Sequence, residues 1–141
     1  GKKIITIEID LELHNSAKDF NYDHSNVDFY LGSSQEIIEK IIPNNSSDNI
    51  IFFLDAHWGE YWPVLDELRI IKEKGIKPVI IIHDFQVPDR PELGFDTWNN
   101  KILNYDYVKD AMTRWSPTHR IEYCEDAITA IKRGVAYFFP R

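Results

Sequence analysis

Short apolar segments and amphipathic segments alternate along the first half of the chain. Four apolar runs have the length and the β-branched or aromatic content of strands. They are Ile4–Ile9, Val27–Leu31, Ile50–Leu54 and Pro78–Ile82. The segments between them have helical patterns and cover Leu11–Phe20, Ser34–Ile42 and Pro63–Lys74. Because such alternation is typical of βαβ units, it predicts an α/β fold with a mostly parallel sheet and helices on both faces.

The pattern is less regular in the second half. Turn residues crowd the stretch Gln86–Asn100, which has no clean period, so we expect a long loop that forms a flap over the strand ends. A helix over Tyr105–Trp115 is expected next, followed by strands over Arg120–Tyr123 and Val135–Phe139. Since no linker or repeat interrupts the chain, residues 1–141 are expected to form a single domain.

The composition narrows the classes of function. A hydrophobic content of 43% is sufficient for a core in a chain of 141 residues. With 16 basic and 23 acidic residues the net charge is −7, which disfavours binding to nucleic acid and favours a small neutral or cationic substrate. The single cysteine, the lack of a signal peptide and the lack of an apolar run of roughly 20 residues predict a cytoplasmic protein without a membrane span.

Polar residues follow the first two predicted strands, where an open parallel sheet binds its ligands. Glu8 can accept hydrogen bonds from both hydroxyls of a ribose, or it can cap the helix that follows. Gly32 permits a close approach of the backbone to a ligand. Ser34 and Gln35 can bond the edge of an adenine, unless this segment only caps the next helix through Ser33.

The next two strands end in carboxylates and imidazoles. Asp55 and Asp84 close two strands that a parallel sheet places side by side, and their hard oxygens suit Mg²⁺. Such a metal can hold and acidify a substrate hydroxyl. His57 and His83 lie at the same edge, and either can accept a proton near neutral pH. These four residues therefore form a candidate catalytic site.

Taken in order, four segments resemble class I S-adenosylmethionine-dependent methyltransferases, and most closely the metal-dependent enzymes of the catechol O-methyltransferase type. The segments are Ile4-Ile5-Thr6-Ile7-Glu8-Ile9, Leu31-Gly32-Ser33-Ser34-Gln35-Glu36, Phe53-Leu54-Asp55-Ala56-His57-Trp58 and Ile82-His83-Asp84. The resemblance implies a Rossmann-like fold, S-adenosylmethionine as cofactor and Mg²⁺ as metal. It assigns Glu8 to the ribose, Ser34 and Gln35 to the adenine, Trp58 to the side of the adenosine, and Asp55 and Asp84 to the metal.

Two departures from that family bear on activity. Phe85 stands where the family has an amide metal ligand, and no strand with a glycine-rich loop occurs in the 141 residues. The resemblance therefore implies an N-terminally truncated methyltransferase fold, whose missing strand would lie between Ile4–Ile9 and Ile50–Leu54. We expect these two strands to join, or a homo-oligomer to cover their edges, and we expect the cofactor to bind weakly or not at all.

Three functions are consistent with this pattern. The first is transfer of a methyl group to an oxygen of a small molecule, with His57 or His83 as the base and Mg²⁺ orienting the acceptor. The second is a non-catalytic Rossmann-like module that binds a nucleotide or a protein. The third is a metal-dependent hydrolase, which would use the same aspartates and histidines but leaves Glu8 and the Ser34-Gln35 segment without a role.

Overall fold

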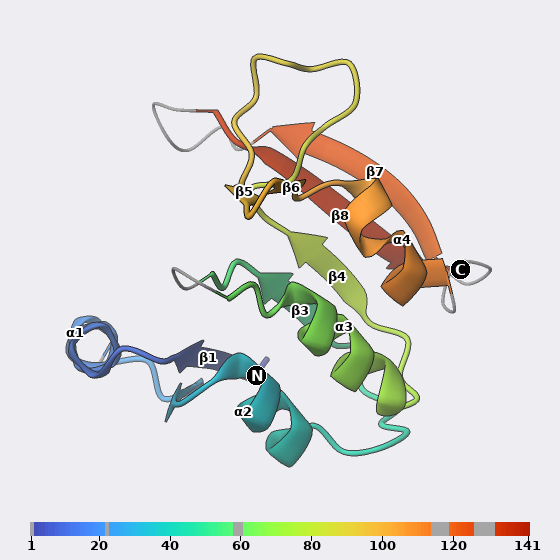
Figure 1. The fold of residues 1–141 in the computed structure, drawn as a ribbon. Coiled ribbons are helices and arrows are strands. Elements are labelled where there is room, and N and C mark those ends of the chain that lie inside the picture. Colours follow the sequence, from blue (N-terminus) through green and yellow to red (C-terminus); the bar gives the residue numbers. More distant parts are fainter. Residues whose placement is uncertain (1, 22, 58–60, 114–118, 126–131) are drawn as a thin grey trace. The chain divides into compact units, whose positions relative to one another are not determined.

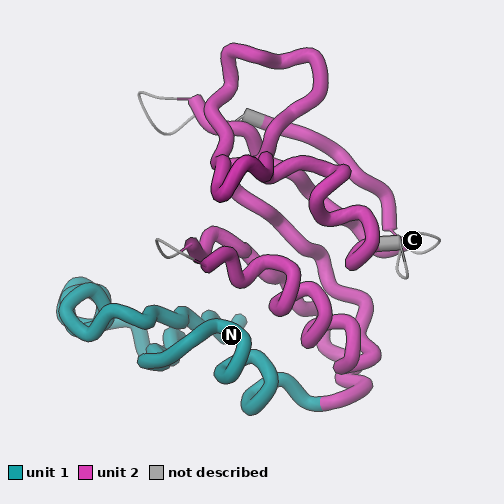
Figure 2. The backbone as a smooth tube through the Cα atoms, viewed as in Figure 1, with its two compact units in different colours: residues 1–43 teal, residues 44–141 magenta. Residues whose placement is uncertain are grey.

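A computed structural model of the chain shows a mixed α/β protein (Figure 1). It describes residues 2–21, 23–57, 61–113, 119–125 and 132–141. The chain divides into two compact units, Gly1–Pro43 and Asn44–Arg141 (Figure 2), which we describe separately. Among the described residues, no helix is long and apolar enough to cross a membrane.

The first unit is a parallel strand pair with two helices. Its elements are β1 (Ile4–Glu8), α1 (Leu11–Phe20), β2 (Val27–Leu31) and α2 (Ser34–Ile41). Asp10 caps α1, because its carboxylate accepts the backbone N–H groups of Glu12 and Leu13. β1 and β2 pair in register from Ile4 with Val27 to Glu8 with Leu31, so both strands end at the same edge. The four segments agree closely with the sequence prediction.

The second unit is built on a four-stranded sheet with the order β3-β4-β8-β7. Its strands are β3 (Ile51–Leu54), β4 (Val79–Ile82), β7 (His119–Glu125) and β8 (Gly134–Pro140). β3 and β4 are parallel neighbours, as the sequence predicts, whereas β8 is antiparallel to both β4 and β7. The four described strands of this unit therefore form a mixed sheet and not a purely parallel one.

One face of this sheet forms the core of the second unit. In register across the strands, Phe52, Ile80 and Phe138 form one buried row. α3 (Val64–Glu73) buries its Leu68 and Ile71 side chains completely, and it contacts α4 (Tyr105–Thr113). Side chains on the opposite face of β3 are open instead: Ile51 is 66% and Phe53 is 60% exposed. Burial on one face alone contributes on the order of 1.5–3 kcal/mol for each large apolar side chain.

The segment after β4 is more regular than the predicted flap. It contains a hairpin of β5 (Thr97–Trp98) and β6 (Lys101–Ile102), which the sequence prediction missed. Backbone hydrogen bonds tie the segment to the end of β4: the N–H of Gln86 donates to Leu103, and the N–H of Asp96 donates to Asp84. The carboxyl end of β4 is thus held against the hairpin.

Candidate functional site

Three polar side chains meet at the carboxyl ends of β3 and β4. His83 Nδ1 lies 3.1 Å from Asp55 Oδ1 and 3.2 Å from Asp84 Oδ1. They meet because the parallel register pairs Leu54 with Ile82, so both strands end together. An ionised carboxylate only accepts hydrogen bonds, so Nδ1 carries the proton in this contact and the lone pair of His83 is on Nε2. The convergence of Asp55, His83 and Asp84 agrees with the sequence prediction.

Asp84 is held in an uncommon backbone conformation. Its φ is +55°, in the left-handed region that non-glycine residues seldom occupy. The arginine that precedes β8, Arg133, donates from Nε to Asp84 Oδ1 and from Nη2 to Asp96 Oδ1. The side chain of Asp84 is 12% exposed and that of Arg133 is 27% exposed. A partly buried, charge-assisted pair of this kind is stronger than a surface ion pair and offsets local strain.

His57 lies at the outer side of the same cluster. Its Nε2 is 3.4 Å from Asp96 Oδ2, and its side chain is 56% exposed. His83 is more enclosed, with 17% of its side chain exposed, and its ring centroid lies 5.8 Å from that of Phe53. Of the two predicted bases, His83 is therefore the one whose orientation is fixed on several sides.

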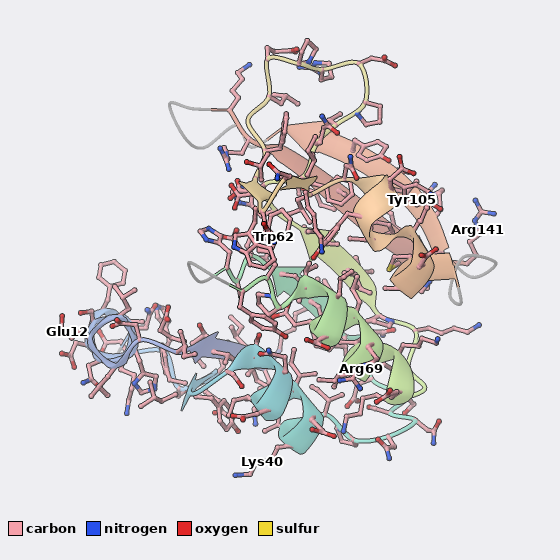
Figure 3. The ribbon with its side chains drawn as sticks, viewed as in Figure 1. Glu12, Lys40, Trp62, Arg69, Tyr105 and Arg141 are labelled. Atoms are coloured by element: carbon pink, nitrogen blue, oxygen red, sulfur yellow. The ribbon has the colours of Figure 1, made fainter. Side chains whose placement is uncertain are left out.

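A small cavity lies beneath these groups. It has about 10 Å³ of free space, room for a single water molecule, and its walls include both histidines and three aspartates. The lining also includes Trp62, labelled in Figure 3, and Glu67, and both are buried. The rings of Trp98 and Tyr107 pack on Trp62. The polar cluster is thus supported on one side by packed aromatic rings.

The pKa of the Asp55 carboxyl is raised above its ordinary value of 3.8. Burial is the largest cause, and the nearby charge of Asp84 acts in the same direction. His83 opposes both effects by attraction and by its hydrogen bond. Since the side chain of Asp55 is still 45% exposed, solvent weakens all of these interactions.

The predicted cofactor residues of the first unit lie at its own strand ends. Glu8 Oε1 accepts the backbone N–H of Asp10 at 2.9 Å, but the N-cap of α1 is Asp10 and not Glu8. Ser33 is the N-cap of α2 but makes no side-chain capping hydrogen bond. Ser34 donates to Gln35 Oε1 at 3.3 Å. Gly32 has a φ of +148°, a value that favours glycine, and Trp58 lies outside the described residues.

The predicted Mg²⁺ site can be compared with the donor atoms present. Those of Asp55, His83 and Asp84 lie within 4.8 Å of one another, as do those of His57, Asp84 and Asp96. Mg²⁺ prefers six oxygen ligands, however, and here an imidazole nitrogen stands between the two predicted carboxylates. A guanidinium already bonds Asp84 and Asp96. The arrangement therefore does not fit a resident Mg²⁺ ion.

Sequence reasoning did not identify three residues of this cluster. Asp96 lies in the predicted loop, Arg133 precedes the last strand, and Glu67 is a charged residue of α3 that is only 1% exposed. A buried position of Glu67 on α3 could have been inferred from its spacing, because Val64, Leu68 and Ile71 share that face of the helix. Arg133 and Asp96 had no comparable signal.

The comparisons with known proteins support the fold. No protein-family model matches the sequence, and no curated protein matches it either. Among solved structures, the chain has the fold of a protein described provisionally as a methyltransferase. That protein is SMU.1697c from Streptococcus mutans, whose crystal structure was determined in complex with SAH. The match covers 99% of this chain and 76% of that chain, with a TM-score of 0.52 and 12% sequence identity.

Proposed function

We propose that this chain belongs to an S-adenosylmethionine-dependent methyltransferase with a Rossmann-like fold that methylates an oxygen of a small molecule. The observation that carries the proposal is the combination of a fold shared with a protein solved with SAH and a His-Asp cluster at the carboxyl ends of β3 and β4. SAH is what remains of S-adenosylmethionine once the methyl group has left. In α/β sheets this edge is where ligands bind and react.

In this reaction the protein has to position the two reactants and remove one proton. The acceptor oxygen attacks the methyl carbon, the bond from that carbon to sulfur breaks, and the electron pair returns to sulfur. The hydroxyl proton must leave at the same time, and His83 Nε2 is the base that we assign to it. Asp55 supports this role because its carboxylate accepts from Nδ1 and stabilises the imidazolium that forms. His57, which contacts Asp96, is the alternative base. Its side chain is more exposed to solvent than that of His83.

The residues proposed for the cofactor are those of the first unit. Glu8 would accept the ribose hydroxyls, and Ser34 and Gln35 would bond the adenine beside Gly32. The bond from the Asp10 N–H uses only Oε1 of Glu8, which is compatible with this role. The proposal assigns no step to a metal, because the arginine-bound carboxylates do not suit Mg²⁺.

Equilibrium dialysis with radiolabelled SAH tests the proposal on the whole chain. We expect saturable binding that is weak, with a dissociation constant well above the micromolar range, because the 141 residues hold no glycine-rich loop. The substitution Glu8→Ala should abolish it. Glu12→Ala is the matched control, since Glu12 is an exposed acid in the first turn of α1 (Figure 3).

Two results would count against methyl transfer. If Glu8→Ala bound SAH as well as the wild type does, the cofactor assignment would fail. If adenosine competed as strongly as SAH, the non-catalytic nucleotide-binding alternative would be favoured, because nothing would then recognise the amino-acid part of the cofactor.

A further inference from the structure

The carboxylates of Asp84 and Asp96 are both paired with the guanidinium of Arg133. Arg133 uses two different nitrogens on two different side chains: Nε bonds Asp84 and Nη2 bonds Asp96. These two carboxylates come from separate segments, the end of β4 and the residue before β5. A bridge between carboxylates of separate segments is the task that a bound divalent ion performs in many sites.

The position of Arg133 is fixed by the backbone around it. Arg133 pairs with Gly94 in an isolated parallel bridge, and the N–H of Gly94 donates to Lys132 at 2.9 Å. The next residue, Gly134, donates to the carbonyl of Gly94 at 2.9 Å. The guanidinium therefore cannot leave the two aspartates by a movement of the backbone unless these hydrogen bonds break.

Gly94 makes room for the arginine side chain. A Cβ atom at this position would lie 2.8 Å from Arg133 Nη1 and 3.0 Å from its Cδ, closer than ordinary van der Waals contact. The absence of a side chain at residue 94 thus lets the arginine stem pass against the backbone. This is the close approach for which glycine is suited.

The charges of Arg133 and the two aspartates disfavour a further cation at this place. Hydrogen bonding to Asp84 is the largest cause that raises the pKa of Arg133, so the guanidinium stays charged at every pH at which the protein is folded. Asp84 and Asp96 carry two negative charges, of which Arg133 offsets one. A divalent ion on the same carboxylates would stand beside a fixed positive charge, in a place where partial burial limits screening.

We propose that Arg133 is the resident cation of this site: it bridges Asp84 and Asp96 in place of a metal and so excludes divalent ions from the cluster. Arg133 is thus a positioning residue, which holds the hairpin segment against the end of β4 and keeps Asp96 beside His57. The inference goes beyond methyl transfer and does not depend on it, because it concerns only the affinity of the cluster for metal ions.

Electron paramagnetic resonance of Mn²⁺, titrated into the whole chain without cofactor, tests this proposal. We expect no saturable Mn²⁺ binding up to millimolar concentration in the wild type. Arg133→Met keeps the length of the stem and removes the charge, and we expect it to bind Mn²⁺ at least about tenfold more tightly. Arg120→Met is the matched control: Arg120 is an exposed arginine of β7 paired with Glu122, and its loss should leave Mn²⁺ binding as in the wild type.

Two outcomes would overturn the proposal. Saturable Mn²⁺ binding by the wild type that is lost on Asp84→Asn would show that Arg133 does not exclude the ion. A folded Arg133→Met variant without any gain of Mn²⁺ binding would show that the arginine is not the reason for exclusion. If Arg133→Met fails to fold by circular dichroism, Arg133→Gln, which retains one donor for an aspartate, is titrated under the same two criteria.

Discussion

Replacement of Gly134 by alanine tests how tightly the start of β8 is held against the end of β4. A Cβ atom at residue 134 would lie far inside the 3.0 Å limit of real Cβ contacts with the carbonyl oxygen of Phe85, and 3.2 Å from its carbonyl carbon. The obstacle is backbone, and Phe85 is completely buried, so neither side can give way locally. The strand start must therefore withdraw.

The cost follows from the hydrogen bonds that such a withdrawal breaks. The N–H of Phe85 donates to Gly134 at 2.8 Å, and the N–H of Gly134 donates to Gly94 at 2.9 Å. A buried backbone group left without a partner costs about 1–3 kcal/mol. The loss of one to two of these bonds predicts a decrease of roughly 2–4 kcal/mol in the free energy of unfolding of the second unit. For a unit of about 100 residues, this corresponds to a decrease in Tm of more than about 10 °C.

Gly94→Ala is the matched comparison, because the new methyl group there meets the arginine side chain and not the backbone. The Arg133 side chain has to shift by a few tenths of an ångström within its two ion pairs, which costs less than a backbone movement, so we expect a loss below about 1.5 kcal/mol. Urea unfolding followed by tryptophan fluorescence measures both variants, since Trp62 and Trp98 lie in this unit. If Gly134→Ala were no less stable than Gly94→Ala, the close approach of β8 to Phe85 would be wrong.

The two faces of β3 should respond differently to truncation: Phe52→Ala should cost about 3–5 kcal/mol in urea unfolding, whereas Phe53→Ala, on the open face, should cost under about 1.5 kcal/mol. Equal losses would mean that the open face is covered in solution. The raised pKa of Asp55 means that folding favours its protonated form, so its contribution to stability is complete below pH 3.8 and is lost as the pH rises through the folded-state pKa. Asp55→Asn should therefore equal the wild type in stability at pH 7 or exceed it by under about 1 kcal/mol, and it should lose this advantage below pH 3.8. Asp110→Asn, at an exposed position of α4, is the control. A wild type that is more stable than Asp55→Asn at pH 7 would mean that the contact with His83 outweighs burial.

Local periodicity was sufficient to predict most of the elements. The predicted bounds of α1 and β2 agree with the structure to the residue, because each element has a regular apolar pattern between turn residues. The β5–β6 hairpin was missed because two-residue strands have no period. Its turn did carry a signal: Asn99 and Asn100 both have positive φ, as the tight turn between paired strands requires, and asparagine is favoured in that conformation.

Part of the candidate site could be predicted from two neighbouring strands alone. Parallel strands joined by a helix end at the same edge, so the residues after β3 and β4 had to meet, and Asp55, His83 and Asp84 do. The parallel register of β3 and β4 was thus enough to predict that Asp55 and Asp84 lie close together. The register of these two strands could not predict the cation that they meet, because Arg133 is 49 residues from Asp84 and 37 residues from Asp96 in the sequence.

The direction of β8 explains why the cation comes from that part of the chain. β8 runs antiparallel to β4, with Ala136 opposite Ile82, so the start of β8 and not its end lies at the carboxyl edge of the sheet. A residue directly before β8 therefore reaches the carboxylates that follow β4, and in this chain that residue is Arg133. In a strand parallel to β4 the start would lie at the opposite edge, and Arg133 would not reach these carboxylates. Which cation the carboxylates of Asp55 and Asp84 meet thus depends on strand direction, which apolar periodicity does not encode.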